Sequence, residues 1–99
     1  MGGIQVYLEN GFEHDRVTVR AGGAELEEPD VTTRYQVGLA SVLELPVPDD
    51  VPVAVTIAVP DRGLIAETTV DPEVTPHLRV NATDGSLVVQ PEAAPPMFA

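Results

Sequence analysis

Apolar and polar side chains alternate with a period of two along much of this chain, which is the pattern of β-strands with one buried face. The longest such stretch is residues 51–70, which read VPVAVTIAVPDRGLIAETTV. The apolar face of its first half consists of Val53, Val55, Ile57 and Val59. Because the Pro-Asp-Arg-Gly sequence that follows favours a tight turn, the stretch predicts a β-hairpin, and we place this hairpin at the centre of the fold.

The same alternation predicts further strands on both sides of this hairpin. They are residues 4–9, 16–21, 24–26, 33–39 and 42–47, and a second hairpin at residues 78–89. The turn dipeptides between them are Asn10-Gly11, Gly22-Gly23 and Asp84-Gly85. The last of these favours a two-residue hairpin turn. We expect the first two strands to pair antiparallel, because they are close in sequence.

Proline and glycine mark the irregular positions. Pro29 has no amide donor for a strand ladder, so we expect a loop or a sheet edge after Leu26. Gly38 indicates a bulge or the close approach of another backbone. The segment from Pro91 onward reads PEAAPPMFA and has no strand pattern. Its proline content predicts an extended tail over residues 91–99, after a single domain at 1–90.

Short strands that recur every eight to twelve residues, without helical periodicity, predict an all-β sandwich. We expect about seven to nine strands in two antiparallel sheets with Greek-key connections, in an immunoglobulin-like or a transthyretin-like arrangement. In its general patterning the chain resembles small bacterial β-sandwich modules. The predicted core consists of Ile4, Val6, Leu8, Val17, Val19, Val37, Leu39, Leu43, Val53, Val55, Ile57, Leu64, Leu78, Val80, Leu87 and Val89.

The charge of the chain excludes several classes of partner. Its 99 residues include 16 acids and five arginines, and the net charge is −11. Binding to nucleic acid needs a basic surface, so we expect no nucleic-acid partner, and anionic membranes are disfavoured for the same reason. No signal peptide or membrane-spanning run is visible, so a cytoplasmic location is the default, although the pattern also fits a secreted mature domain.

Residues with catalytic potential are few. The chain has no cysteine, and neither His14 nor His77 has a second histidine nearby at metal-ligand spacing. Ser41 and Ser86 are its only serines, and neither lies in a nucleophile-elbow motif. We therefore expect no cofactor, and a small enzyme is the least favoured interpretation.

Two groups of acids allow a weaker hypothesis of calcium binding. They are Glu9, Glu13 and Asp15 in the first group, and Glu25, Glu27, Glu28 and Asp30 in the second. A calcium ion takes six to eight oxygen ligands, often from a run of regularly spaced aspartates, and no such run is present. A solvated acidic surface is therefore the preferred interpretation, and calcium binding is an alternative.

Aromatic side chains and the tail are the candidate contact surfaces. Carbohydrate-binding modules use exposed aromatic platforms, and Tyr7 with Phe12 is the only pair close in sequence that could form one. Burial of Phe12 under its loop is the alternative that we prefer. In the tail, large apolar residues stand beside prolines, which pre-order an extended segment for docking. The candidate contact residues are Tyr7, Phe12, Pro95, Pro96, Met97 and Phe98.

These observations favour a non-catalytic module that binds another protein or a second copy of itself. The contact would be made through a sheet edge, the end loops or the tail. A calcium- or carbohydrate-binding accessory domain is the alternative.

Overall fold

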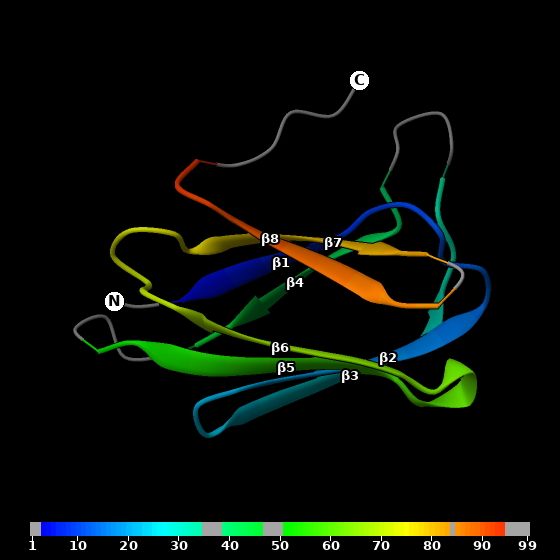
Figure 1. The fold of residues 1–99 in the computed structure, drawn as a ribbon, viewed down its shortest axis with the longest axis horizontal. Helices are drawn as coiled ribbons and strands as arrows, with labels where there is room; N and C mark the ends of the chain where they lie inside the picture. Colours follow the sequence, from blue (N-terminus) through cyan, green and yellow to red (C-terminus); the bar gives the residue numbers. More distant parts are fainter. Residues whose placement is uncertain (1–2, 35–38, 47–50, 84, 95–99) are drawn as a thin grey trace.

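The computed structural model describes residues 3–34, 39–46, 51–83 and 85–94. These residues form eight strands and one short 3-10 helix (Figure 1). The strands are β1 (Ile4–Leu8), β2 (Asp15–Ala21), β3 (Ala24–Val31), β4 (Ser41–Leu45), β5 (Val53–Val59), β6 (Leu64–Val70), β7 (His77–Ala82) and β8 (Leu87–Glu92). The helix η1 (Pro60–Arg62) joins β5 to β6. The described part of the chain contains no helix long and apolar enough to cross a membrane.

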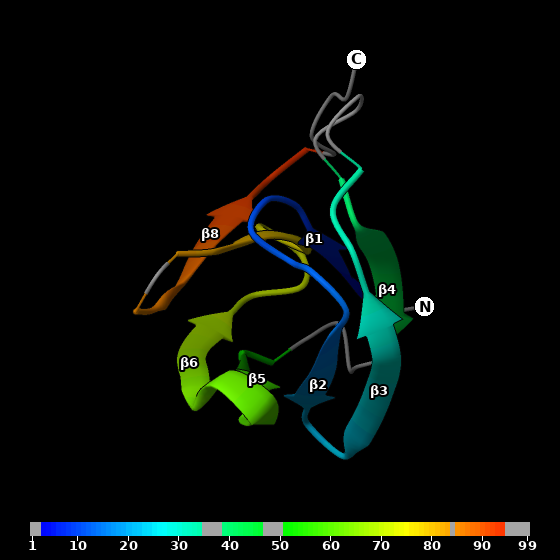
Figure 2. The same cartoon turned by 90° about the vertical axis from the view of Figure 1, so that its right-hand side faces the viewer.

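The strands form two four-stranded sheets that pack face to face, as the predicted β-sandwich requires (Figure 2). Sheet A has the order β4-β1-β7-β8, and sheet B has the order β3-β2-β5-β6. All neighbours are antiparallel except β1 and β7, which run parallel. The expectation of purely antiparallel sheets therefore fails at this one pair.

The expected pairing of the first two strands is wrong, because β1 and β2 lie in different sheets. Both edges of β1 are already used: Leu8 lies opposite Ser41 of β4 and opposite Val80 of β7. The loop of residues 9–14 carries the chain across to the other layer. In the immunoglobulin order the first and second strands share a sheet, so the order found here differs from it.

The central hairpin is confirmed. β5 and β6 pair in continuous register from Val53 opposite Val70 to Val59 opposite Leu64. The turn closes with a hydrogen bond from Gly63 N to Pro60 O, and Gly63 has a left-handed backbone that suits glycine. The hairpin spans a central strand and an edge, however, because β6 is the last strand of sheet B.

β3 is longer than its pattern predicts and continues through Pro29 to Val31. It lies at the edge of sheet B, where a missing amide donor is tolerated. The register with β2 also shifts there, since Asp15 lies opposite Val31 and Val17 lies opposite Glu28. β3 thus has one residue more than β2 over this interval, which is a β-bulge beside the proline.

The core lies between the two sheets and contains most of the residues expected there. Leu39 and Val89 are only half-buried, and Val37 lies outside the described residues. Several further side chains complete the core: Phe12, Ala21, Val31, Leu45, Val59, Val70 and Ala82.

The second hairpin, β7–β8, is confirmed. A hydrogen bond from Thr83 N to Ser86 O closes it around the predicted turn, of which residue 84 lies outside the described residues. β8 ends at Glu92, so residues 91 and 92 belong to sheet A rather than to the tail expected from Pro91 onward. Of the predicted strand at 33–39, the structure describes an antiparallel bridge between Arg34 and Leu39, and Gly38 lies outside the described residues.

Candidate functional site

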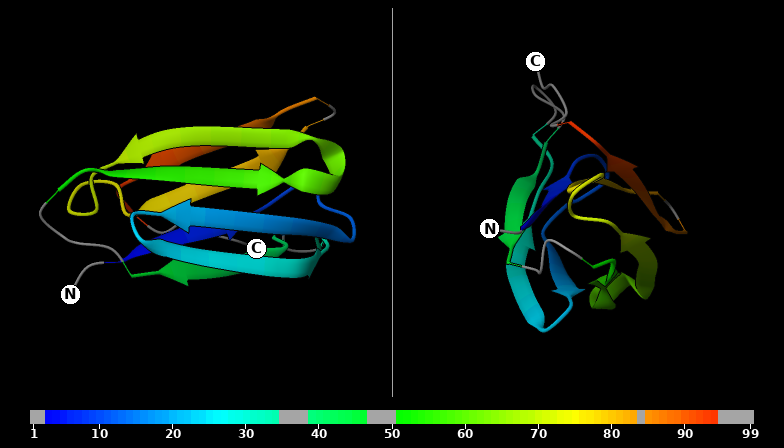
Figure 3. Two further views of the ribbon diagram at one scale, coloured as in Figure 1. Left: turned by 90° about the horizontal axis from the view of Figure 1, so that it is seen from below. Right: turned by 90° about the vertical axis from the view of Figure 1, so that its left-hand side faces the viewer.

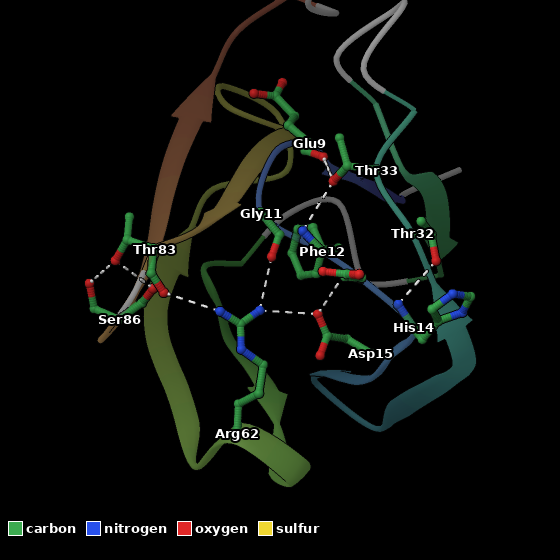
Figure 4. A network of polar contacts seen from close by, with 11 residues as sticks. Glu9, Gly11, Phe12, His14, Asp15, Thr32, Thr33, Arg62, Thr83 and Ser86 are labelled. Atoms are coloured by element: carbon green, nitrogen blue, oxygen red, sulfur yellow. Dashed lines mark hydrogen bonds and ion pairs between the residues drawn. The ribbon is translucent and has the colours of Figure 1, made fainter.

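Arg62 links three loops at one end of the sandwich (Figure 4). Its Nη1 donates hydrogen bonds to Gly11 O at 2.9 Å and to Asp15 Oδ2 at 3.0 Å. Its Nη2 lies 3.4 Å from the carbonyl oxygen of Thr83, in the β7–β8 connection. Asp15 is buried and also accepts a hydrogen bond from Glu13 N at 2.9 Å. The loops at this end of the molecule are therefore held together by hydrogen bonds, and the polar groups that form these bonds stabilise the fold.

Phe12 lies at the same end of the sandwich, and its side chain belongs to the core. Its backbone amide donates to Thr33 Oγ1 at 3.1 Å, and that hydroxyl donates to Glu9 O at 2.6 Å. The structure confirms the preferred interpretation, in which Phe12 is buried under its own loop. Phe12 therefore offers no exposed ring to a partner.

Tyr7 lies on the outer face of sheet A, because Val6 and Leu8 on either side of it point into the core. It is nevertheless only 7% exposed. Its hydroxyl donates to Gln5 Oε1 at 2.6 Å and lies 3.0 Å from His77 Nδ1. Burial raises the pKa of Tyr7, and the nearby carboxylate of Glu44 adds to the effect. The exposed patch of Tyr7 and Phe12, which was the less favoured alternative, is not formed, since Tyr7 lies on the outer face of sheet A and Phe12 lies in the core.

Glu9 and Arg79 form a second ion pair, next to Tyr7 on the face of sheet A, in which the carboxylate is buried and the guanidinium is half-buried. Glu9 is 3% exposed, and its carboxylate accepts hydrogen bonds from Arg79 Nε at 2.7 Å and from Asn81 Nδ2 at 3.2 Å. The hydrogen bond to Glu9 raises the pKa of Arg79 above its ordinary value. Both oxygens of the Glu9 carboxylate thus accept hydrogen bonds from side chains of the protein itself.

The two acidic groups do not converge on a point. In the first group, Glu9 and Asp15 are each held by a different arginine. In the second group, the carboxylate of Glu25 pairs with Arg20, and that of Asp30 lies 2.9 Å from His14 Nδ1. Across residues 3–34, 39–46, 51–83 and 85–94, no three histidine or acidic side chains are placed to hold a metal ion together.

The two histidines lie at opposite ends of the sandwich. His14 precedes β2, whereas His77 begins β7 and lies opposite Gln5 at the start of β1. Beside His77 there is an open hollow of about 590 Å³. Its lining is mixed apolar and polar and consists of Gly3, Ile4, Gln5, Glu44, Leu45, Pro46, Pro76 and His77.

The edges of the two sheets differ in how well they are protected against pairing with another chain. Each sheet has two edge strands, and three of the four carry features that hinder such pairing. β3 contains Pro29 and four carboxylates, and β8 contains Pro91. β4 has only five residues and runs directly into Pro46.

β6 has none of these features. Its seven residues, LIAETTV, include no proline and a single charged side chain, Glu67, and its register with β5 has no bulge. Ile65 is 67% exposed on its outer face. Figure 3 shows β6 at the border of sheet B, with β5 as its neighbour in the sheet. No described strand is hydrogen-bonded to its other edge, and β8 of sheet A lies close to this border. Its outer backbone groups are therefore a ready template for an added strand, and this edge is the candidate functional site.

The described residues form a small β-sandwich in which one edge strand, β6, contains no proline, bulge or cluster of charges. No protein-family model, curated protein or solved structure matches the chain. The site is thus defined by the geometry of the chain itself.

Sequence reasoning named the sheet edges in general and did not single out β6. The composition of residues 64–70 suggested a strand near the centre of the fold, and only the sheet order shows that it is an edge. A comparison of the strand sequences could have distinguished β6. The β3 and β8 segments contain proline or clustered acids, and β6 contains neither. The tail residues Pro95, Pro96, Met97 and Phe98 lie outside the described residues.

Proposed function

We propose that this chain is a non-catalytic protein-binding module, and that its partner adds a strand to the free edge of β6. The observation that carries the proposal is the contrast among the four edges, of which β6 alone has an interior-like composition among the described strands. Sheet proteins normally protect such edges, so an unprotected one is expected to have an occupant. In strand addition the backbone hydrogen bonds supply affinity, and alternate side chains supply specificity.

The other two surfaces considered from the sequence have weaker support. The loops at the Arg62 end are held together by hydrogen bonds within the protein. The tail, residues 91–99, contributes its first two residues to β8, and residues 95–99 lie outside the described part of the chain. We therefore assign the contact to the sheet edge.

For the finer fold class we favour the transthyretin-like arrangement over the immunoglobulin-like one. The support is that β1 and β2 lie in different sheets, whereas the immunoglobulin order places the first two strands together.

A peptide selection tests the proposed function. Random nine-residue peptides displayed on phage are selected on the intact chain, and the tightest binder is titrated into isotope-labelled protein. We expect the largest amide shift changes in β6, because an added strand bonds to its backbone. Binders that instead map to the hollow beside His77 or to the Arg62 loops contradict the proposal.

A matched pair of variants adds a second readout. Ile65→Lys introduces a long charged side chain on β6, whereas Val88→Lys makes the same kind of change on β8, where Val88 is 50% exposed. We expect the first variant to weaken the selected peptide by about 10-fold and the second to leave its affinity unchanged. Equal effects of the two variants contradict an assignment to β6.

A further inference from the structure

The outer face of sheet B has a row of four side chains that ends at the free edge. Arg20 lies opposite Glu25 on one side and Thr56 on the other, and Thr56 lies opposite Glu67 of β6. The guanidinium of Arg20 binds the carboxylate of Glu25. Among the described residues, Glu67 accepts a hydrogen bond from Thr56 Oγ1, at 3.3 Å, and forms no ion pair. The one cation of this row, Arg20, therefore pairs with Glu25 of β3. The carboxylate of Glu67 on β6 has no cation beside it among the described residues.

Within the described part of the chain, no arginine forms an ion pair with Glu67. Four of the five arginines are paired with acids within the described residues: Arg16 with Asp61, Arg20 with Glu25, Arg62 with Asp15, and Arg79 with Glu9. None of these described pairs involves Glu67. The chain also contains no lysine and has a net charge of −11. A cation opposite Glu67 would therefore come most readily from outside the molecule.

A second copy of the chain is a poor occupant for this edge. Glu67 is the central residue of β6, so antiparallel pairing of two copies in full register places the two Glu67 side chains directly opposite each other. Like charges in that position destabilise a strand pair. Two molecules that each carry −11 also repel one another at long range.

We infer that the occupant of the β6 edge is an extended cationic segment of another protein, with an arginine or lysine opposite Glu67. This inference rests on the proposed function and adds the chemistry of the partner. Such a residue continues the row Glu25–Arg20–Thr56–Glu67 by one more strand and pairs the free carboxylate. Cross-strand pairs of opposite charge stabilise a sheet, and the charge of the protein steers a cationic segment toward it.

The inner side of the same edge favours apolar residues in the partner. Ala66 of β6 and Val89 of β8 are half-buried and pack against the core from the two sheets, and β6 and β8 are in contact. Side chains alternate along a strand, so the partner residues on either side of the cation point inward, toward this apolar border. The expected partner segment therefore alternates apolar residues with polar ones and has a cation among the polar set.

Three capped seven-residue peptides test the inference. The neutral probe alternates valine with threonine, and the other two carry arginine or glutamate in place of the central threonine. Each sequence reads the same in both directions, so the side-chain order does not depend on strand direction. We expect the arginine probe to bind about 5-fold more tightly than the neutral probe, and the glutamate probe to bind more weakly than both.

Two variants separate Glu67 from the general charge of the protein. Glu67→Gln and Glu27→Gln each remove one carboxylate from an exposed position on an edge strand of sheet B, on β6 and β3 respectively. We expect the preference for arginine over threonine to disappear in Glu67→Gln and to persist in Glu27→Gln. Higher salt should reduce the preference, since it screens exposed charges.

The outcomes distinguish this inference from the proposed function. Equal binding of the arginine and neutral probes, with shift changes in β6, overturns the cationic partner and leaves strand addition intact. A preference for arginine that survives Glu67→Gln also overturns it. If the free chain forms dimers in which the amides of β6 exchange more slowly with solvent, the edge is occupied by a second copy. This result overturns the inference as well.

Discussion

Gly11→Ala is expected to lower the free energy of unfolding by about 3–5 kcal/mol. A Cβ atom at this position would lie 1.9 Å from the carbonyl oxygen of Ala82, so the β7–β8 hairpin would have to move. The backbone of Gly11 also has a φ of 90°, which side chains rarely adopt. Both effects act at once, and urea unfolding followed by circular dichroism measures their sum.

Gly23→Ala is the matched control for this prediction. It makes the same chemical change in the turn between β2 and β3, where an added Cβ meets no atom within 4 Å. We expect a change of less than about 1 kcal/mol there, close to the ordinary effect of a surface substitution. Equal losses in the two variants would contradict the packing of the 9–14 loop against β7.

The second large effect is expected for Arg62→Ala, which should cost about 2–4 kcal/mol. The substitution leaves the buried carboxylate of Asp15 without its cation. It also removes the hydrogen bond that Arg62 donates to the carbonyl oxygen of Gly11. Charges that stay buried without a partner are strongly destabilising. The loops joined by Arg62 should also exchange their amides faster, which hydrogen-exchange mass spectrometry detects.

Arg20→Ala serves as the control, because Arg20 and its partner Glu25 are both exposed. We expect less than about 1 kcal/mol for it, in line with surface ion pairs in general. If Arg62→Ala were no more damaging than Arg20→Ala, Arg62 would not hold the end of the sandwich together.

Much of the fold could be predicted because strands with one buried face alternate visibly. The inward positions of β5 are all β-branched, and those of β2 and β7 include valines and a leucine that form the core as expected. The partners of each strand could not be predicted in the same way. Alternation shows which face of a strand is buried, but it says nothing of which strand lies beside it, and β1 therefore paired with β4 and β7 instead of β2.

The polar residues show the same limit. Glu9 and Asp15 were grouped by their closeness in sequence, yet each binds an arginine more than forty residues away, at Arg79 and Arg62. Such pairs depend on the tertiary fold, and the sequence contains no local signal for them. The free edge of β6 depends on topology as well, because its composition alone suggested an interior strand.

The most direct test of strand addition uses backbone methylation of the partner. The tightest selected peptide is made in two forms, with N-methyl groups on its odd-numbered or on its even-numbered residues. In a strand, successive amides point to opposite sides, so one form loses its hydrogen bonds to β6 and the other keeps them. We predict that one form binds the protein like the parent peptide and that the other does not bind. Unchanged binding of both forms would contradict strand addition at β6.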